Sequence, residues 1–147
     1  AKSADVVVMA AAVADVRPVR SALHKLKKDP HTGLICDLGS IELEATPDIL
    51  AGLGKSKPAG QVLVGFAAET ENLIANAQSK LERKGADLIV ANDVSRDSGV
   101  FGGDRNTVHL VSTSGVEDWP NMSKDEVAQK LMERLAQMLV PQNKVSE

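Results

Sequence analysis

The sequence predicts an α/β fold with a doubly wound, mostly parallel sheet of Rossmann-like type and an inserted β-hairpin or flap. Three observations predict it. The 147 residues suit one domain with its own core. The composition is 43% hydrophobic but only 2% aromatic, which is typical of Val, Leu, Ile and Ala packed in a sheet covered by helices. Apolar strands also alternate with amphipathic helices along the chain, as they do in doubly wound folds.

The first third of the chain contains one buried strand and a long irregular insertion. Residues 5–10 include a continuous apolar run, which predicts a strand buried on both faces. Residues 16–30 combine prolines with clustered lysines, so we expect an exposed, mobile flap there. Residues 34–38 and 41–45 are separated by Gly-Ser and predict a hairpin with one solvated face.

A short helix should follow the insertion. Thr46 is a suitable N-cap, and Pro47 occupies the favoured first position of a helix. We expect this helix to end near Gly52 or Gly54, because glycine weakens a helix interior. Its N-terminus would offer free backbone amides to an anion.

The second half repeats the strand and helix pattern. Strands are predicted at residues 61–66, 87–91 and 107–111, with a helix from about residue 70 to Lys84 and a final helix capped by Ser123. The helix residues expected to face the core are Leu73, Ala77, Leu81, Leu131, Leu135 and Leu139, with Val127 and Met138 nearby.

Composition excludes several classes of protein. The net charge of −3 gives no global basic field for nucleic acid, and no apolar run approaches the roughly 20 residues that span a bilayer. The single cysteine, Cys36, cannot form a disulfide within the chain, so we expect a cytoplasmic protein. Metal-ligand spacing of His and Cys is absent from the sequence, as are Walker and Gly-x-Gly-x-x-Gly motifs.

Functional residues should lie where strands end, because ligands of open α/β sheets bind outside the carboxyl ends of strands. Asp15 and Arg17 follow the first strand, and the small residues Ala11 and Ala12 before them allow a ligand to approach the backbone. An isolated loop aspartate more often satisfies local amides. The surrounding residues make a ligand-facing turn an equal alternative.

Two groups of lysines could neutralise phosphate. Lys25, Lys27 and Lys28 concentrate charge in the predicted flap, which could close over a polyphosphate, although such clusters are usually solvated. Lys80 and Lys84 lie four residues apart on one helical face, where like charges repel unless an anion is present. A solvated surface helix tolerates the same spacing.

Two further strand ends carry candidate side chains. Phe66 ends a predicted buried strand, where it either packs in the core or stacks on a base. Asn92 and Asp93 follow the next strand and either read donors and acceptors of a ligand or close the turn locally.

In this order, the motifs resemble the phosphopantothenate-cysteine ligase family, the synthetase half of the bacterial CoaBC (Dfp) protein of coenzyme A biosynthesis. The resemblance covers most of the chain. The matching blocks are AAVAD at 11–15, KLKK at 25–28, TPDIL at 46–50, VGFAAET at 64–70, KLERK at 80–84 and DLIVANDV at 87–94.

The resemblance implies a CTP-dependent ligase. The carboxylate of 4'-phosphopantothenate would attack the α-phosphate of CTP and release pyrophosphate, and the amine of L-cysteine would then displace CMP. Mg²⁺ would bridge the phosphates, with no metal ligand identified in the chain, and Lys25 would be catalytic. The implied nucleotide-binding residues are Asp15, Lys25, Pro47, Asp48, Ile49, Leu50, Phe66, Lys80 and Lys84. A homodimer is also implied.

The sequence departs from this family at its start, because the glycine-rich segment and the asparagine that handle the acyl half of the reaction are missing. We therefore expect residues 1–147 to be a single α/β domain forming the C-terminal fragment of a longer chain. FMN would be present only if a decarboxylase domain precedes it. Two alternatives remain open: a truncated nucleotide-binding or dimerisation domain without activity alone, and a generic Rossmann-type oxidoreductase domain.

Overall fold

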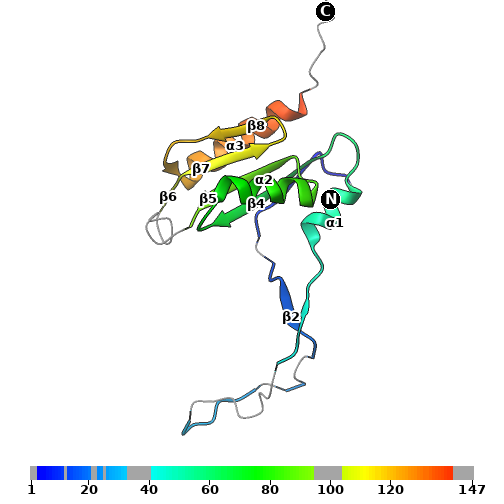
Figure 1. Cartoon of the computed structure of the whole chain (residues 1–147), viewed down its shortest axis with the longest axis vertical. Coiled ribbons are helices and arrows are strands. Elements are labelled where there is room, and N and C mark those ends of the chain that lie inside the picture. The colour runs from blue at the N-terminus through cyan, green and yellow to red at the C-terminus, as the bar shows by residue number, and fades with distance from the viewer. Residues whose placement is uncertain are drawn as a thin grey trace, which may run out of the picture. The chain divides into compact units, whose positions relative to one another are not determined.

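The computed structural model describes residues 3–11, 13–20, 23–24, 26–32, 41–94 and 104–140. The chain forms two compact units. The larger unit comprises residues 1–11 and 49–147, and the smaller one residues 12–48. Figure 1 shows the elements of both units in chain order.

The larger unit is built on a five-stranded mixed sheet, which confirms the α/β class. The strand order is β1 (Val6–Met9), β4 (Val62–Glu69), β5 (Leu88–Asp93), β7 (Val108–Ser112) and β8 (Gly115–Asp118). β1, β4 and β5 are parallel, whereas β7 and β8 are each antiparallel to their neighbours. The predicted strand at 107–111 therefore forms, but it runs against β5.

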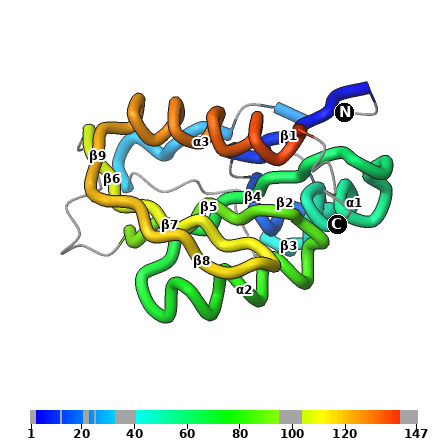
Figure 2. The backbone as a smooth tube through the Cα atoms, turned by 90° about the horizontal axis from the view of Figure 1, so that it is seen from above, coloured from blue at the N-terminus to red at the C-terminus, as the bar shows by residue number. Residues whose placement is uncertain are grey.

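Helices cover both faces of this sheet (Figure 2). α3 (Lys124–Leu139) lies on one side and α2 (Leu73–Lys84) on the other. Each face has its own apolar cluster, because side chains alternate between the two faces of a strand. Val64, Val90 and Leu110 pack on the α3 side, and Leu63 and Ile89 pack on the α2 side. None of the helices in the described part of the chain is long and apolar enough to cross a membrane.

α2 follows the prediction closely. Ala77 and Leu81 are buried, and Leu73 packs beside them. The helix stops at Gly85, whose φ of 62° lies in the left-handed region that favours glycine. The preceding strand β4 is longer than expected, however, because it continues past Phe66 to Glu69 while still pairing with β5.

α3 begins with a complete capping box. The Ser123 hydroxyl accepts a hydrogen bond from the Glu126 N–H at 3.2 Å, and the Glu126 carboxylate accepts one from the Ser123 N–H at 2.7 Å. Leu131 and Leu135 are buried as expected. The expectation for Leu139 was wrong, since it is the last residue of the helix and is 41% exposed.

We expect Ser123→Ala to destabilise the larger unit by about 1 kcal/mol, because the Glu126 N–H loses the hydroxyl that accepts its hydrogen bond. The backbone N–H and hydroxyl of Ser123 hold the pKa of Glu126 below its ordinary value. This contribution is present above the ordinary glutamate pKa of about 4.3 and is lost as the pH falls through the lowered pKa. The difference in melting temperature between wild type and variant should therefore shrink in acid. A pH-independent difference would contradict the capping box.

α1 (Ile49–Ser56) differs from the prediction at both ends. It begins at Ile49 and not directly after Thr46, whose hydroxyl donates to the backbone carbonyl of Ala14. It also continues through Gly52 and Gly54, which were expected to stop it. Gly54 has a packing role instead: a Cβ at this position would collide with the backbone carbonyl of Lys84.

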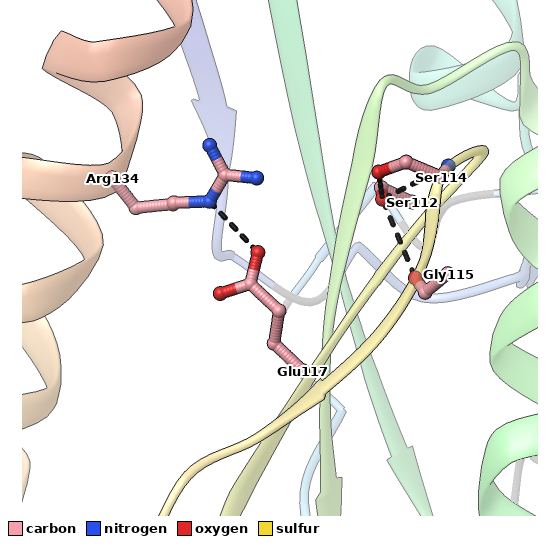
Figure 3. A network of polar contacts seen from close by, with 5 residues as sticks. All are labelled: Ser112, Ser114, Gly115, Glu117 and Arg134. Atoms are coloured by element: carbon pink, nitrogen blue, oxygen red, sulfur yellow. Dashed lines mark hydrogen bonds and ion pairs between the residues drawn. The ribbon is translucent and has the colours of Figure 1, made fainter.

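A hairpin joins β7 and β8, and β8 was not predicted from the sequence. The Ser112 and Ser114 hydroxyls lie 2.8 Å apart in the turn, and the Ser112 hydroxyl also donates to the Gly115 carbonyl (Figure 3). Arg134 of α3 donates to Glu117 of β8 at 2.9 Å. Because β8 is exposed at every residue, it lacks the apolar run by which buried strands are found.

A short ribbon lies where α3 begins. β6 (Arg105–Asn106) pairs antiparallel with β9 (Met122–Ser123). Trp119 is only 4% exposed and donates its backbone N–H to the Val108 carbonyl.

The smaller unit contains a two-stranded antiparallel sheet of β2 (Val16–Pro18) and β3 (Leu43–Ala45). Residues 16–18 were predicted as part of an irregular flap, and the structure corrects this, because backbone pairing with β3 makes them a strand. All six residues of β2 and β3 are exposed, so both faces are solvated rather than one. The predicted hairpin partner at 34–38 lies outside the described residues.

Candidate functional site

At the carboxyl edge of the five-stranded sheet, the neighbouring strands β1 and β4 end at different levels. β1 finishes at Met9, which pairs with Gly65, whereas β4 continues for four more residues that pair only with β5. The Glu69 carbonyl accepts from Val94 on the β5 side. Because backbone groups alternate along a strand, the Phe66 carbonyl and the polar groups of Ala68 face the side where β1 has ended. This stretch, residues 66–69, is called the β4 ledge below.

Lys80 of α2 is held at the β4 ledge. Its ammonium donates to the Phe66 carbonyl at 2.7 Å, in a half-buried position. Among the described residues, Lys80 forms no ion pair with a carboxylate. Its positive charge is therefore available to an anion bound at the ledge.

Lys84 lies one helical turn further along, as the spacing predicted, and is also half-buried. Its backbone carbonyl packs against Gly54, so the end of α2 is in close contact with α1. Leu50 of α1 packs over Gly65, where an added Cβ would lie 2.8 Å from a Leu50 methyl group. Gly54 and Gly65 thus allow α1 to pack closely on α2 and on the sheet. Ile49, at the start of α1, is 46% exposed.

Acidic and amide side chains end the two central strands. Glu69 and Asp93 are paired in register at the ends of β4 and β5. Asn76 of α2 donates to the Glu69 carboxylate at 3.0 Å, which ties the ledge to the second turn of that helix. Asn92 alternates with Val90, so it belongs to the face that carries Phe66.

Phe66 itself is partly buried and packs against the apolar cluster of the α3 side. Of the two roles predicted for Phe66, packing in the core is therefore confirmed in part. A partly exposed ring at the end of a strand can still contribute its remaining surface to a ligand. The larger unit thus brings together Phe66, Lys80, Asn92 and Asp93, which the sequence had placed at separate strand and helix positions.

The other predicted site residues belong to the smaller unit. The Asp15 carbonyl accepts a hydrogen bond from the Thr46 N–H at 2.9 Å, immediately next to the β2–β3 pair. Arg17 donates to Glu44 across that pair at 2.7 Å, and both side chains remain well exposed. Lys27 and Lys28 are exposed. Pro47 and Asp48 also belong to the smaller unit. Two further candidates, Ala12 and Lys25, lie outside the described residues. The last candidate, Ala11, belongs to the larger unit and is exposed just after β1.

Sequence reasoning missed two features of the larger unit. The extension of β4 to Glu69 beyond the end of β1 depends on strand lengths, which sequence patterns define poorly. Asn106 has a buried side-chain oxygen without a hydrogen-bond partner. Its position in a two-residue ribbon gives no periodicity from which it could have been found.

The described residues contain no group of three or more His, Cys, Asp or Glu that could hold a metal ion on their own. Mg²⁺ often binds through substrate phosphates and only one or two carboxylates. Glu69 and Asp93 at neighbouring strand ends fit that second mode and not a dedicated metal cage.

The fold and this edge define the class of open α/β domains that bind ligands outside the carboxyl ends of their strands. The chain belongs to the family of DNA/pantothenate metabolism flavoprotein C-terminal domains, whose family model matches residues 1–139. This result confirms the resemblance found in the motifs.

Individual relatives agree with this assignment. The chain is 41% identical over 136 residues to the coenzyme A biosynthesis bifunctional protein CoaBC of Bacillus subtilis, covering 91% of this chain and 32% of that protein. A crystal structure of the C-terminal domain of CoaBC matches with a TM-score of 0.68 and 37% identity, over 93% of this chain and 56% of the other. A Cab2 variant, solved with phosphopantothenate-cysteine, shares the fold at a TM-score of 0.60 and 21% identity, over 88% and 44%. The chain therefore spans about a third of its curated relative.

Proposed function

We infer that this chain is the nucleotide-binding part of a CTP-dependent ligase of coenzyme A biosynthesis, which joins 4'-phosphopantothenate to L-cysteine in the cytoplasm. The observation that carries the proposal is the β4 ledge, where half-buried Lys80, which has no carboxylate partner among the described residues, donates to the Phe66 carbonyl just beyond the end of β1. The membership of the family and the CoaBC relatives support the reaction.

The reaction has two steps. A carboxylate oxygen of phosphopantothenate attacks the α-phosphorus of CTP, and the bond to pyrophosphate breaks. The cysteine amine then attacks the acyl carbon, loses a proton, and displaces CMP. Negative charge builds up on the phosphates in the first step, so fixed cations there lower the barrier.

Each residue of the site has a proposed role in this scheme. Lys80 and Lys84 bind phosphate oxygens from α2, and Lys25 acts as the catalytic cation, with Lys27 and Lys28 beside it. Phe66 packs near the cytosine. The remaining proposed ligand contacts are Asp15, Arg17, the segment Pro47, Asp48, Ile49 and Leu50, the small residues Ala11 and Ala12, and Asn92 and Asp93.

Mg²⁺ supplies charge neutralisation when it is bound with CTP, and Glu69 and Asp93 are the described carboxylates that fit its binding through phosphate. FMN belongs to this proposal only in a longer protein that carries a decarboxylase domain. We further propose that the chain forms a homodimer.

The second candidate, a nucleotide-binding domain without activity alone, is favoured by the coverage of the relatives. The chain spans only 56% of the solved CoaBC C-terminal domain. The same assay separates the two: this chain, and a longer protein containing it, are incubated with CTP, Mg²⁺, phosphopantothenate and cysteine, and pyrophosphate is measured.

We expect pyrophosphate and phosphopantothenoylcysteine from the longer protein, because it carries both halves of the site. CTP binding without product by the short chain would support the second candidate for the chain alone. Absence of pyrophosphate from the longer protein would refute the ligase assignment, and an equal rate with ATP would refute the dependence on CTP.

A further inference from the structure

Glu69 carries a carboxylate that the fold holds in place without neutralising its charge. It is the last residue of β4, and β1 has already ended at the level of Gly65. Its side chain is half-buried, and its backbone carbonyl accepts a hydrogen bond from the Val94 N–H at 2.9 Å. Among the described residues, no lysine, arginine or histidine forms an ion pair with it. The negative charge at the end of the β4 ledge is therefore available to a cation.

Asn76, near the start of α2, orients this carboxylate. Its side-chain nitrogen donates to one carboxylate oxygen of Glu69, Oε2, at 3.0 Å and to the backbone carbonyl of Glu71 at 3.1 Å. An amide nitrogen has two hydrogens, so it can serve both acceptors. The Asn76 backbone N–H also donates to the Asn72 carbonyl at 2.9 Å. Asn76 is thus fixed by the helix and holds Oε2, whereas Oε1 forms no hydrogen bond within the described ranges of the chain.

A neutral donor orients a carboxylate without cancelling its charge. Asp87 shows the contrast, because it forms an ion pair with Lys57. Carboxylates that bind a metal ion are commonly oriented by a hydrogen bond from a second residue. The contact between Glu69 and Asn76 has this arrangement, since one carboxylate oxygen is held and the other is open to a ligand.

The place of Glu69 on the ledge suits a metal ion that is bound through phosphate. Ala67 packs in the apolar cluster on the α2 side, and side chains alternate along a strand, so Glu69 projects from the same face. Lys80 of α2 donates to the carbonyl of Phe66, three residues before Glu69. One end of β4 thus has an ammonium group for phosphate oxygens and a carboxylate for the cation that those oxygens carry.

We propose that Asn76 is a positioning residue, which orients Glu69 as a ligand of the Mg²⁺ ion bound with the triphosphate. This role rests on the proposed function, in which CTP binds at the β4 ledge. Mg²⁺ demands near-ideal octahedral geometry and takes only one or two protein carboxylates beside phosphate oxygens and water. The direction of each carboxylate therefore matters, and loss of an orienting partner typically lowers metal affinity about 10–100-fold.

The test measures CTP binding to the longer ligase by calorimetry, once with saturating Mg²⁺ and once with a chelator. Asn76→Leu removes the donor and keeps a side chain of similar size. We expect it to weaken CTP binding in Mg²⁺ by about tenfold or more and to leave binding in chelator unchanged. Gln78→Leu is the matched control, because it removes an exposed amide from the same helix, and both of its affinities should equal those of wild type.

A double variant separates positioning from folding. Glu69→Gln removes the carboxylate charge and should weaken CTP binding in Mg²⁺ at least as much as Asn76→Leu does. Because Asn76 acts through Glu69, adding Asn76→Leu to Glu69→Gln should weaken binding no further. A purely structural role would add its effect in both backgrounds and would weaken CTP binding in chelator as well. Either of these results, or a smaller loss in Glu69→Gln than in Asn76→Leu, would overturn the proposal.

Wild-type ligase distinguishes the role of Asn76 from the proposed function. Equal binding of CTP with and without Mg²⁺ would overturn the positioning role and leave the nucleotide site intact. Absence of CTP binding under both conditions would overturn the proposed function together with the positioning role. Undiminished binding in Mg²⁺ by Asn76→Leu would refute the role of Asn76 alone.

Discussion

Gly54→Ala should destabilise the larger unit strongly, by about 3 kcal/mol, a cost typical of severe overpacking. The added Cβ would collide with the backbone carbonyl of Lys84, and backbone cannot rotate away as a long side chain can. α1 would have to move off the end of α2. For a chain of this size we expect the melting temperature to fall by roughly 10 °C.

Gly52→Ala is the matched control for this variant. Gly52 lies in the same helix, and a Cβ there meets nothing within 4 Å. Because alanine favours a helix more than glycine does, Gly52→Ala should stabilise slightly, by about 0.5–1 kcal/mol. Changes in stability of opposite sign for the two variants would show that position 54 requires glycine because α1 contacts α2 there. Equal melting temperatures would show that α1 does not pack on α2 in this way.

Lys80→Met should reduce kcat/KM for CTP in the longer ligase by about 100-fold or more, the range found when one charge-stabilising donor is removed. The methionine keeps the length and packing of the lysine but has no charge. The lost hydrogen bond to the Phe66 carbonyl should lower stability by only about 1 kcal/mol. A large kinetic effect with a small stability effect would separate phosphate binding from folding.

The control for Lys80→Met is Lys55→Met, which removes a lysine from the exposed last turn of α1. We expect normal turnover and normal CTP binding from it, which tests whether general positive charge is sufficient. Near-normal kcat/KM in Lys80→Met, measured by pyrophosphate release, would contradict the role of the β4 ledge.

Patterns that depend on burial were predictable from the sequence. The apolar runs of β4 and β5 and the helical spacing of Ala77 and Leu81 mark segments that must face a core, whatever they pack against. The prediction that the strand at residues 5–10 is buried on both faces was wrong, because β1 lies at the edge of the sheet and its Val8 is 42% exposed. The stop of α2 at Gly85 was equally predictable, since its left-handed backbone favours glycine. These signals arise from the chain itself.

Elements stabilised by distant partners were not predictable in the same way. β2 is a strand because residues 43–45 pair with it across a long insertion. β8 forms because a tight turn returns the chain along β7. Thr46 was predicted to cap α1, but its hydroxyl donates to the carbonyl of Ala14, which lies 32 residues away in the chain. Gly54 was predicted to end α1, but the helix continues through it, and a Cβ there would collide with the backbone of α2 at Lys84.

By itself, the sequence determined the α/β class, the family and the segments that carry the candidate site, because composition, periodicity and short motifs are local properties of a chain. Only the tertiary structure decided that β4 extends beyond β1, that Lys80 holds the Phe66 carbonyl, and that the Asn106 oxygen is buried without a donor. Each of these depends on where one segment ends relative to another, and that alignment is fixed by packing between residues far apart in the chain.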